Sequence, residues 1–134
     1  MLIARVGTLT CAIPVEHVVE TMRPLPVEPL GQAAAYVRGI AVIRGAPTLV
    51  IDAAALFETT AGAGARFVVI RAASRTAALL VDAVSEVRAI ARAELQALPP
   101  LARAATSDVI AAIGAVDSEL VVVLEAAKLV TAWT

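Results

Sequence analysis

Apolar residues gather in short runs that glycine or charged residues interrupt, which is the pattern of β-strands joined by tight turns. The stretch Val37–Asp52 shows it most clearly. Ile40–Ile43 is a nearly continuous apolar run, which predicts a strand buried on both faces. Arg44-Gly45 then breaks the run as a turn, and Leu49–Ile51 returns as a second strand. The stretch therefore predicts a β-hairpin.

The hairpin ends at Asp52, which precedes the good helix formers Ala53–Phe57. A short acceptor side chain before such residues predicts a helix N-cap. The same pattern recurs in Ile110–Val130, where two apolar runs flank a turn at Asp117-Ser118 and Glu125 follows the second run. We therefore expect Asp52 and Glu125 to be structural caps at equivalent positions in two copies of one unit.

The segments that precede the two hairpins also match each other. AIPVEHVVE at residues 12–20 aligns with ALLVDAVSE at residues 78–86, so the order of motifs indicates an internal duplication. Two copies are too few for a solenoid, and each half would be marginally stable alone. We predict a single domain over residues 1–134, made of two similar sub-barrels over about residues 1–62 and 63–134. They would share a core, and whether they exchange strands is left open.

Helices are expected only as short segments. After Pro14, four apolar residues between Val15 and Met22 have helical spacing, although valine is also common in strands. The other short helices should follow Asp52 and Glu125. The remaining apolar runs predict strands at Leu2–Val6, Leu9–Ile13, Arg66–Arg71 and Thr76–Val81.

The composition narrows the class of protein. The chain is 60% hydrophobic but only 3% aromatic, so valine, isoleucine, leucine and alanine must build the core. The net charge is −1, and lysine and arginine do not cluster, so nucleic acid is not an expected partner. No apolar run has the length of a membrane-spanning helix, and the first residues do not resemble a signal peptide. With Cys11 as the single cysteine, these features favour a cytoplasmic protein without membrane insertion.

Side chains suited to catalysis or metal binding are sparse. His17 is the only histidine, and beside Glu16 it is more simply a solvated surface residue. Cysteine and histidine alone cannot supply a zinc site, and no phosphate-binding loop motif occurs. A catalytic pair of carboxylates at Asp52 and Glu125 is the alternative to two caps, but their repetition favours caps. We expect no catalytic residues, no metal and no cofactor.

Arg44 is unusual in so apolar a context. Two interpretations are open: the side chain points to solvent from the turn, or a buried guanidinium binds loop carbonyl groups. Gly39 and Gly45 bracket the first strand of this hairpin, which predicts that backbone passes close to both of its ends.

Taken together, these motifs resemble the CheW-like coupling proteins of bacterial chemotaxis. The most specific parts are VRG-x₄-RG-x₅-ID from Val37 and VDAVSEV from Val81, and the resemblance extends over essentially the whole chain. It implies an all-β fold of two interlocked SH3-like five-stranded β-barrels with short helices. It also implies a non-enzymatic adaptor in cytoplasmic chemoreceptor arrays, which couples the cytoplasmic tip of the receptors to the regulatory domain of a CheA-type histidine kinase.

The resemblance also assigns residues to surfaces. It places Val18, Glu20, Val84 and Val87 at the receptor groove between the barrels, although both valines of VDAVSEV could instead fill the shared core. For the central hairpin it gives Gly39 and Arg44 either a partner-binding or a structural role. Kinase contacts would lie at the ends of the barrels, and other CheW-like proteins are further candidate partners.

The chain departs from the family pattern at three positions. Val42, Leu49 and Ala53 stand where the family usually has asparagine, proline and leucine. One alternative is therefore a divergent member that binds receptors without engaging the kinase. An alternative from another class is a small all-β enzyme or ligand-binding barrel. It would need polar groups that converge on a cavity, and the sequence offers almost none.

Overall fold

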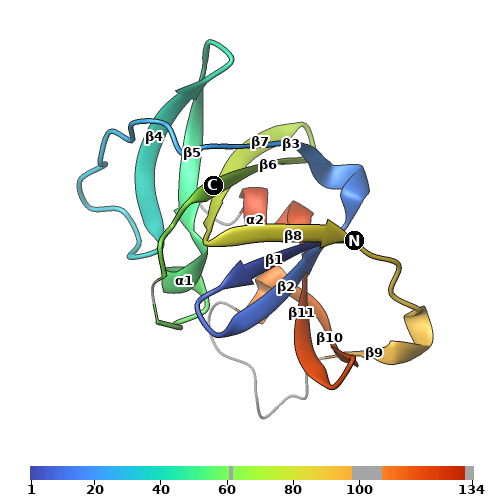
Figure 1. The fold of residues 1–134 in the computed structure, drawn as a ribbon. Coiled ribbons are helices and arrows are strands. Elements are labelled where there is room, and N and C mark those ends of the chain that lie inside the picture. The colour runs from blue at the N-terminus through green and yellow to red at the C-terminus, as the bar shows by residue number, and fades with distance from the viewer. Residues whose placement is uncertain (61, 98–106, 132–134) are drawn as a thin grey trace.

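The computed structural model describes residues 1–60, 62–97 and 107–131, and Figure 1 shows their arrangement. The first copy contains β1 (Leu2–Val6), β2 (Leu9–Ile13), β3 (Val18–Met22), β4 (Val37–Ile43) and β5 (Ala46–Asp52). The second copy contains β6 (Arg66–Ala72), β7 (Arg75–Val81), β8 (Ala83–Val87), β9 (Leu95–Gln96), β10 (Ile110–Val116) and β11 (Glu119–Leu124). Short helices are η1 (Val15–His17), α1 (Ala53–Leu56), η2 (Arg92–Glu94), η4 (Ser107–Val109) and α2 (Ala126–Thr131). The all-β prediction is confirmed, and no described helix is long and apolar enough to cross a membrane.

The described strands form two sheets that interlock. The five-stranded sheet has the order β3-β6-β7-β5-β4, and the six-stranded sheet has the order β8-β1-β2-β11-β10-β9. Each copy therefore inserts its first hairpin into the sheet of the other copy. Parallel pairing of β7 with β5 and of β2 with β11 joins the inserted hairpins to their hosts. The six-stranded sheet exceeds the expected five strands because β9 pairs along β10.

Because of this exchange, neither sheet is made from one half of the chain alone. The five-stranded sheet spans residues 18–81, whereas the six-stranded sheet combines residues 2–13 with residues 83–124. The chain changes sheet between β2 and β3 and again between β7 and β8, not at the linker near residue 62. The cause is the pairing of the inserted hairpins, which local sequence patterns do not specify.

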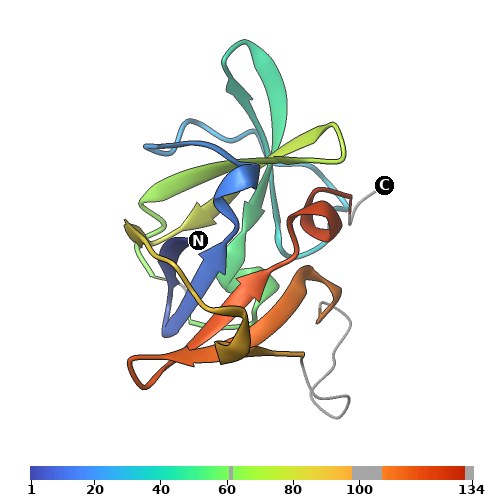
Figure 2. The same cartoon turned by 90° about the vertical axis from the view of Figure 1, so that its right-hand side faces the viewer.

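One central cluster of buried side chains joins both sheets and both α-helices. Its largest fully buried members are Ile13, Ile51, Leu56, Ile70, Leu79, Leu124 and Leu129. Two smaller clusters pack on a single sheet each, one around Phe67 in the five-stranded sheet and one around Ile3 in the six-stranded sheet. The β4–β5 and β10–β11 hairpins project from opposite ends of this core, at the top and bottom of Figure 2.

The helix expected after Pro14 is reduced to the single 3₁₀ turn of η1. The apolar residues that follow belong to strand β3, which pairs along β6 from Val18 opposite Ile70 to Met22 opposite Phe67. Valine fits a pleated surface well, so pairing with β6 overrides the helical spacing of these residues.

The prediction that the strand at Ile40–Ile43 is buried on both faces is wrong. Its burial alternates: Ala41 and Ile43 are buried, whereas Val42 is 63% exposed. Ala41 and Ile43 belong to the cluster around Phe67, and no residue of β4 belongs to the central cluster, so only one face of the strand meets a core.

Tight turns close the hairpins as the sequence indicates. Both central residues have positive φ at Arg44-Gly45, Ala73-Ser74 and Asp117-Ser118, as type I′ turns require. The expected close approach of backbone is wrong for Gly45, where an added Cβ would meet nothing within 4 Å. It is confirmed for Gly39, where that Cβ would lie 2.0 Å from the carbonyl oxygen of Glu28.

The cause of the crowding at Gly39 is a crossing segment. The N–H of Glu28 donates to the carbonyl of Ile40 at 2.8 Å, and the N–H of Ile40 donates to the carbonyl of Glu28 at 2.9 Å. These two hydrogen bonds hold the segment against β4. Gly39 itself has φ +140°, which side-chain-bearing residues rarely adopt.

We therefore predict that Gly39→Ala lowers the free energy of unfolding by about 2–4 kcal/mol, from the combined backbone strain and steric clash. Gly31→Ala is the matched control, because nothing lies within 4 Å of its added Cβ. Chemical denaturation measures both variants. Equal stability of the two variants would contradict the structural role of Gly39.

Candidate partner-binding surfaces

Strands β3 and β8 are the third strands of the two copies, and each lies at an edge of a different sheet. Val18 on β3 and Val84 on β8 are half-buried, and both pack against the central cluster. Val19 and Val87 on the same strands are 55% and 67% exposed. We call these four valines the edge-strand surface. It presents exposed apolar groups from both sheets beside one shared core.

Glu20 forms an ion pair with Arg44 at the tip of the β4–β5 hairpin. Nε of Arg44 donates to Oε2 at 3.1 Å and Nη2 donates to Oε1 at 2.8 Å, which is bidentate geometry. Strands β3 and β4 are the two edges of the five-stranded sheet, so the ion pair joins its edges. The Arg44 side chain is 77% exposed, so it points to solvent and binds a carboxylate, not loop carbonyl groups. The hydrogen bond from Arg44 lowers the pKa of Glu20 below its ordinary value.

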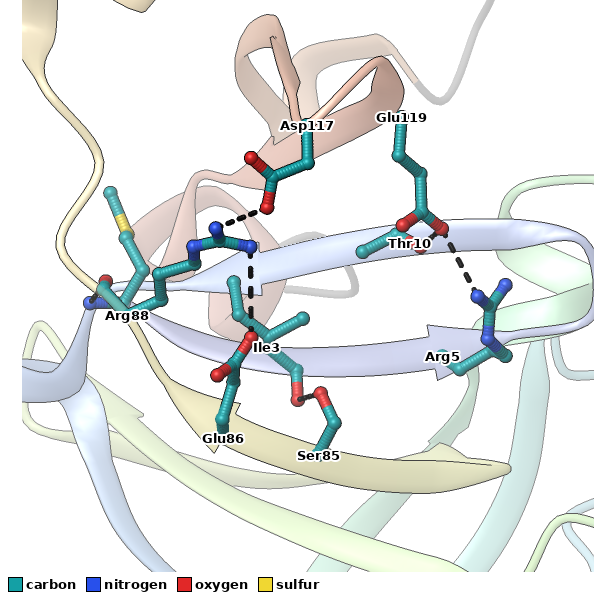
Figure 3. Close-up of polar contacts among 9 residues, drawn as sticks. Ile3, Arg5, Thr10, Ser85, Glu86, Arg88, Asp117 and Glu119 are labelled. Carbon is teal, nitrogen blue, oxygen red and sulfur yellow. Dashed lines mark hydrogen bonds and ion pairs between the residues drawn. The ribbon is translucent and has the colours of Figure 1, made fainter.

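An ion pair of opposite polarity occupies the corresponding place on the six-stranded sheet (Figure 3). Here Arg88, just beyond β8, donates to Asp117 in the β10–β11 turn and lies 3.7 Å from Glu86. In the duplication, Glu86 aligns with Glu20, and Asp117 occupies the turn position of Arg44. The hydrogen bond to Asp117 raises the pKa of Arg88. The sequence analysis missed this pair because Arg88 lies beyond the aligned repeat.

A cavity of about 190 Å³ lies on the six-stranded sheet beside this second ion pair. Ile3 and Val121 contribute apolar lining. Arg5 and Glu119 also line the cavity, and their side chains form an ion pair at 3.1 Å (Figure 3). The hydroxyl of Thr10 donates to the same carboxylate and is the main cause of its lowered pKa. The charged lining residues are thus engaged with one another, which leaves few polar groups to orient a small ligand.

The described residues contain no group of three or more histidine, cysteine, aspartate or glutamate side chains that could hold a metal ion. Burial raises the pKa of the Cys11 thiol to about 12. A thiol with so high a pKa stays protonated at neutral pH and is a poor nucleophile.

Asp52 and Glu125 occupy equivalent positions at the ends of β5 and β11. Oδ1 of Asp52 accepts hydrogen bonds from the N–H groups of Ala54 at 3.0 Å and Ala55 at 3.4 Å, and so caps α1. Its other oxygen lies 3.5 Å from Nε of Arg38. Before α2, the backbone carbonyl of Glu125 accepts a bond from the N–H of residue 129 at 3.0 Å. The two acids lie at the ends of different sheets.

These features define an all-β domain of two small sheets with exchanged hairpins. The family model of the CheW-like domain matches residues 1–132, and the chain therefore belongs to the CheW-like domain family. The fold is similar to the solved structure of the scaffolding protein TtCheW from Thermoanaerobacter tengcongensis. The TM-score is 0.83 at 20% sequence identity, over 96% of this chain and 89% of that chain. No curated protein sequence matches the chain.

The capping geometry gives a stability prediction. Asp52→Ala should lower the free energy of unfolding by about 1 kcal/mol, the usual loss for an N-cap, while Asp52→Asn keeps an acceptor and should lose less. Chemical denaturation measures both variants. If Asp52→Ala left stability unchanged but abolished binding of a partner, its role would be in recognition instead.

The ion pair of Glu20 and Arg44 gives a pH prediction. Arg44→Gln should raise the pKa of Glu20 toward its ordinary value, which NMR titration of the carboxyl group measures. Because the folded-state pKa is lowered, the pair stabilises the fold at neutral pH. Its contribution is lost as the pH falls through the folded-state pKa of Glu20.

The matched control for this titration is Arg38→Gln, because that guanidinium pairs with Asp52 and not with Glu20. An unchanged pKa of Glu20 in Arg44→Gln would show that the ion pair does not persist in solution.

Proposed function

We propose that the protein is a non-enzymatic adaptor of chemosensory signalling, which binds the cytoplasmic tip of methyl-accepting chemoreceptors and the regulatory domain of a CheA-type kinase. Membership of the CheW-like family supports this proposal. The observation that carries it is the edge-strand surface, where Val18 and Val84 from two sheets pack on one core. Exposed apolar groups beside such a core suit the apolar face of a partner helix, as a receptor tip would provide.

The proposed mechanism is differential contact. Receptor states that pack differently on the edge-strand surface would change how the adaptor and the kinase pack together. By thermodynamic linkage, kinase binding would change the affinity for the receptor by the same factor. Weak contacts would add up across an array by multivalency. The hairpin ends are candidate kinase contacts, because they project away from the core at opposite ends of the molecule (Figure 2).

A second candidate, a coupler that binds receptors without the kinase, is favoured by one residue. Of the three departures from the family pattern, Val42 is 63% exposed, whereas Leu49 is half-buried and Ala53 is fully buried. Only Val42 therefore changes the surface substantially, and it does so close to the tip of the β4–β5 hairpin.

We predict that Val87→Glu stays folded but weakens binding of a receptor tip fragment more than about tenfold, because a partner would bury an unpaired carboxylate. Val42→Glu is the matched control, because it introduces the same charge at a residue of similar exposure, 63% against 67%, on another strand. Binding to a receptor tip fragment and to a CheA regulatory domain should be measured for wild type and both variants by titration calorimetry.

The outcomes separate the alternatives. If Val87→Glu prevents folding, Val87 belongs to the core, and if it binds receptor as wild type does, the groove lies elsewhere. Wild-type binding to the receptor fragment without binding to the kinase domain would favour the second candidate. Binding to neither partner would refute the adaptor proposal.

A further inference from the structure

The chain passes between the two sheets twice, and the two crossings are built differently. The first runs through Pro14 and the 3₁₀ helix η1, between β2 and β3. The second, from β7 to β8, consists of the single residue Asp82. In the duplication Asp82 aligns with Glu16, which is an exposed residue of η1. A crossing of one residue leaves little freedom in how β8 departs from the five-stranded sheet.

The groups of Asp82 bind backbone at this crossing from three directions. Its N–H donates to the carbonyl of Arg5 at 2.9 Å. Its Oδ2 accepts a hydrogen bond from the N–H of Gly7 at 2.6 Å, and its Oδ1 accepts one from the N–H of Gly64 at 2.9 Å. Gly7 lies in the β1–β2 turn of the six-stranded sheet, and Gly64 leads into β6 of the five-stranded sheet. One carboxylate therefore ties backbone of both sheets to the point where the chain crosses.

Two glycines near this junction have no space for a side chain. An added Cβ at Gly62 would lie 2.2 Å from Oδ2 of Asp82. An added Cβ at Gly7, which has φ +57°, would lie 2.3 Å from the carbonyl oxygen of Thr60. Both oxygens of Asp82 act as acceptors, so an asparagine would turn an amide NH₂ toward one of two N–H groups and lose that bond.

Strand β8 begins immediately after this junction and carries half of the edge-strand surface. Ala83 pairs with Arg5 and Val84 pairs with residue 4, so the start of β8 is in register with β1 beside the carboxylate. We propose that Asp82 is a positioning residue for partner binding: it fixes the direction in which β8 leaves the five-stranded sheet, and so the placement of Val84 and Val87 relative to β3. The inference rests on the proposed receptor contact, and the role it gives Asp82 acts through β8 and not by direct contact with the receptor.

The test compares two carboxylates that each accept two backbone hydrogen bonds in the same chain. Asp82→Asn and Asp82→Ala are the test variants, and Asp52→Asn and Asp52→Ala, whose carboxylate caps α1, are the matched controls. Affinity for a receptor tip fragment is measured at a temperature where each variant is folded. The Asp82 variants should bind about tenfold more weakly, whereas the Asp52 variants should lose stability but keep wild-type affinity. If Asp82→Ala does not fold, Asp82→Asn provides the comparison.

A second readout does not depend on the receptor. Residual dipolar couplings of backbone amides in β3 and β8 report the relative orientation of the two sheets, which should change in Asp82→Asn and not in Asp52→Asn. Unchanged orientation, or unchanged receptor affinity in a folded Asp82 variant, would overturn the positioning role. A third outcome is that the orientation changes in Asp82→Asn but the wild-type protein binds no receptor fragment. This outcome would support the role of Asp82 in sheet placement and would refute only the proposed receptor contact.

Discussion

The structure depends on the exchange of the first hairpins between the two copies. The β6–β7 hairpin lies between β3 and β5, and the β1–β2 hairpin lies between β8 and β11, each held by one antiparallel and one parallel pairing. Neither sheet can therefore form from one half of the chain. A half of this length would be marginal alone, so the exchange converts two weak units into one domain with a common core. The same arrangement leaves β3 and β8 at sheet edges beside that core.

The exchange of hairpins builds the cores, whereas contacts at the edges of each sheet come from ion pairs. In both sheets an arginine and a carboxylate connect the region of an edge strand to a hairpin turn, with opposite polarity in the two copies. Exposed ion pairs contribute little to stability, but these two place one charged side chain of each sign at a hairpin turn. One end consequently presents the guanidinium of Arg44, and the other presents the carboxylate of Asp117, which is 74% exposed. An anionic partner surface would favour the first end and a cationic one the second.

Sequence patterns could predict the local features of this fold. The hairpin turns at Arg44-Gly45 and Asp117-Ser118 and the position of Asp52 before a helix all follow from short-range chemistry, and the duplication is visible by alignment. Patterns could not predict which strands pair across the two copies, because pairing is a property of distant segments. The segment from Val18 to Met22 was ambiguous for the same reason, since only its pairing with β6 decides between helix and strand. The roles of Arg88 and Asp82 likewise depend on partners far away in the chain.

The departures from the family pattern can now be separated by where they lie. Leu49 pairs with Ala77 in the parallel β5–β7 ladder, where a leucine restores the N–H that a proline lacks, so this change concerns strand pairing. Ala53 is fully buried at the start of α1, so a smaller side chain there changes packing. Val42 instead adds apolar surface to the edge of β4, beside a shallow groove of about 340 Å³ that Ile40 and Val27 also line. An asparagine at that site would offer a partner hydrogen bonds, and valine offers only apolar contact. A difference in partner choice between this chain and the family pattern would therefore arise at the β4 edge before it arose at the edge-strand surface.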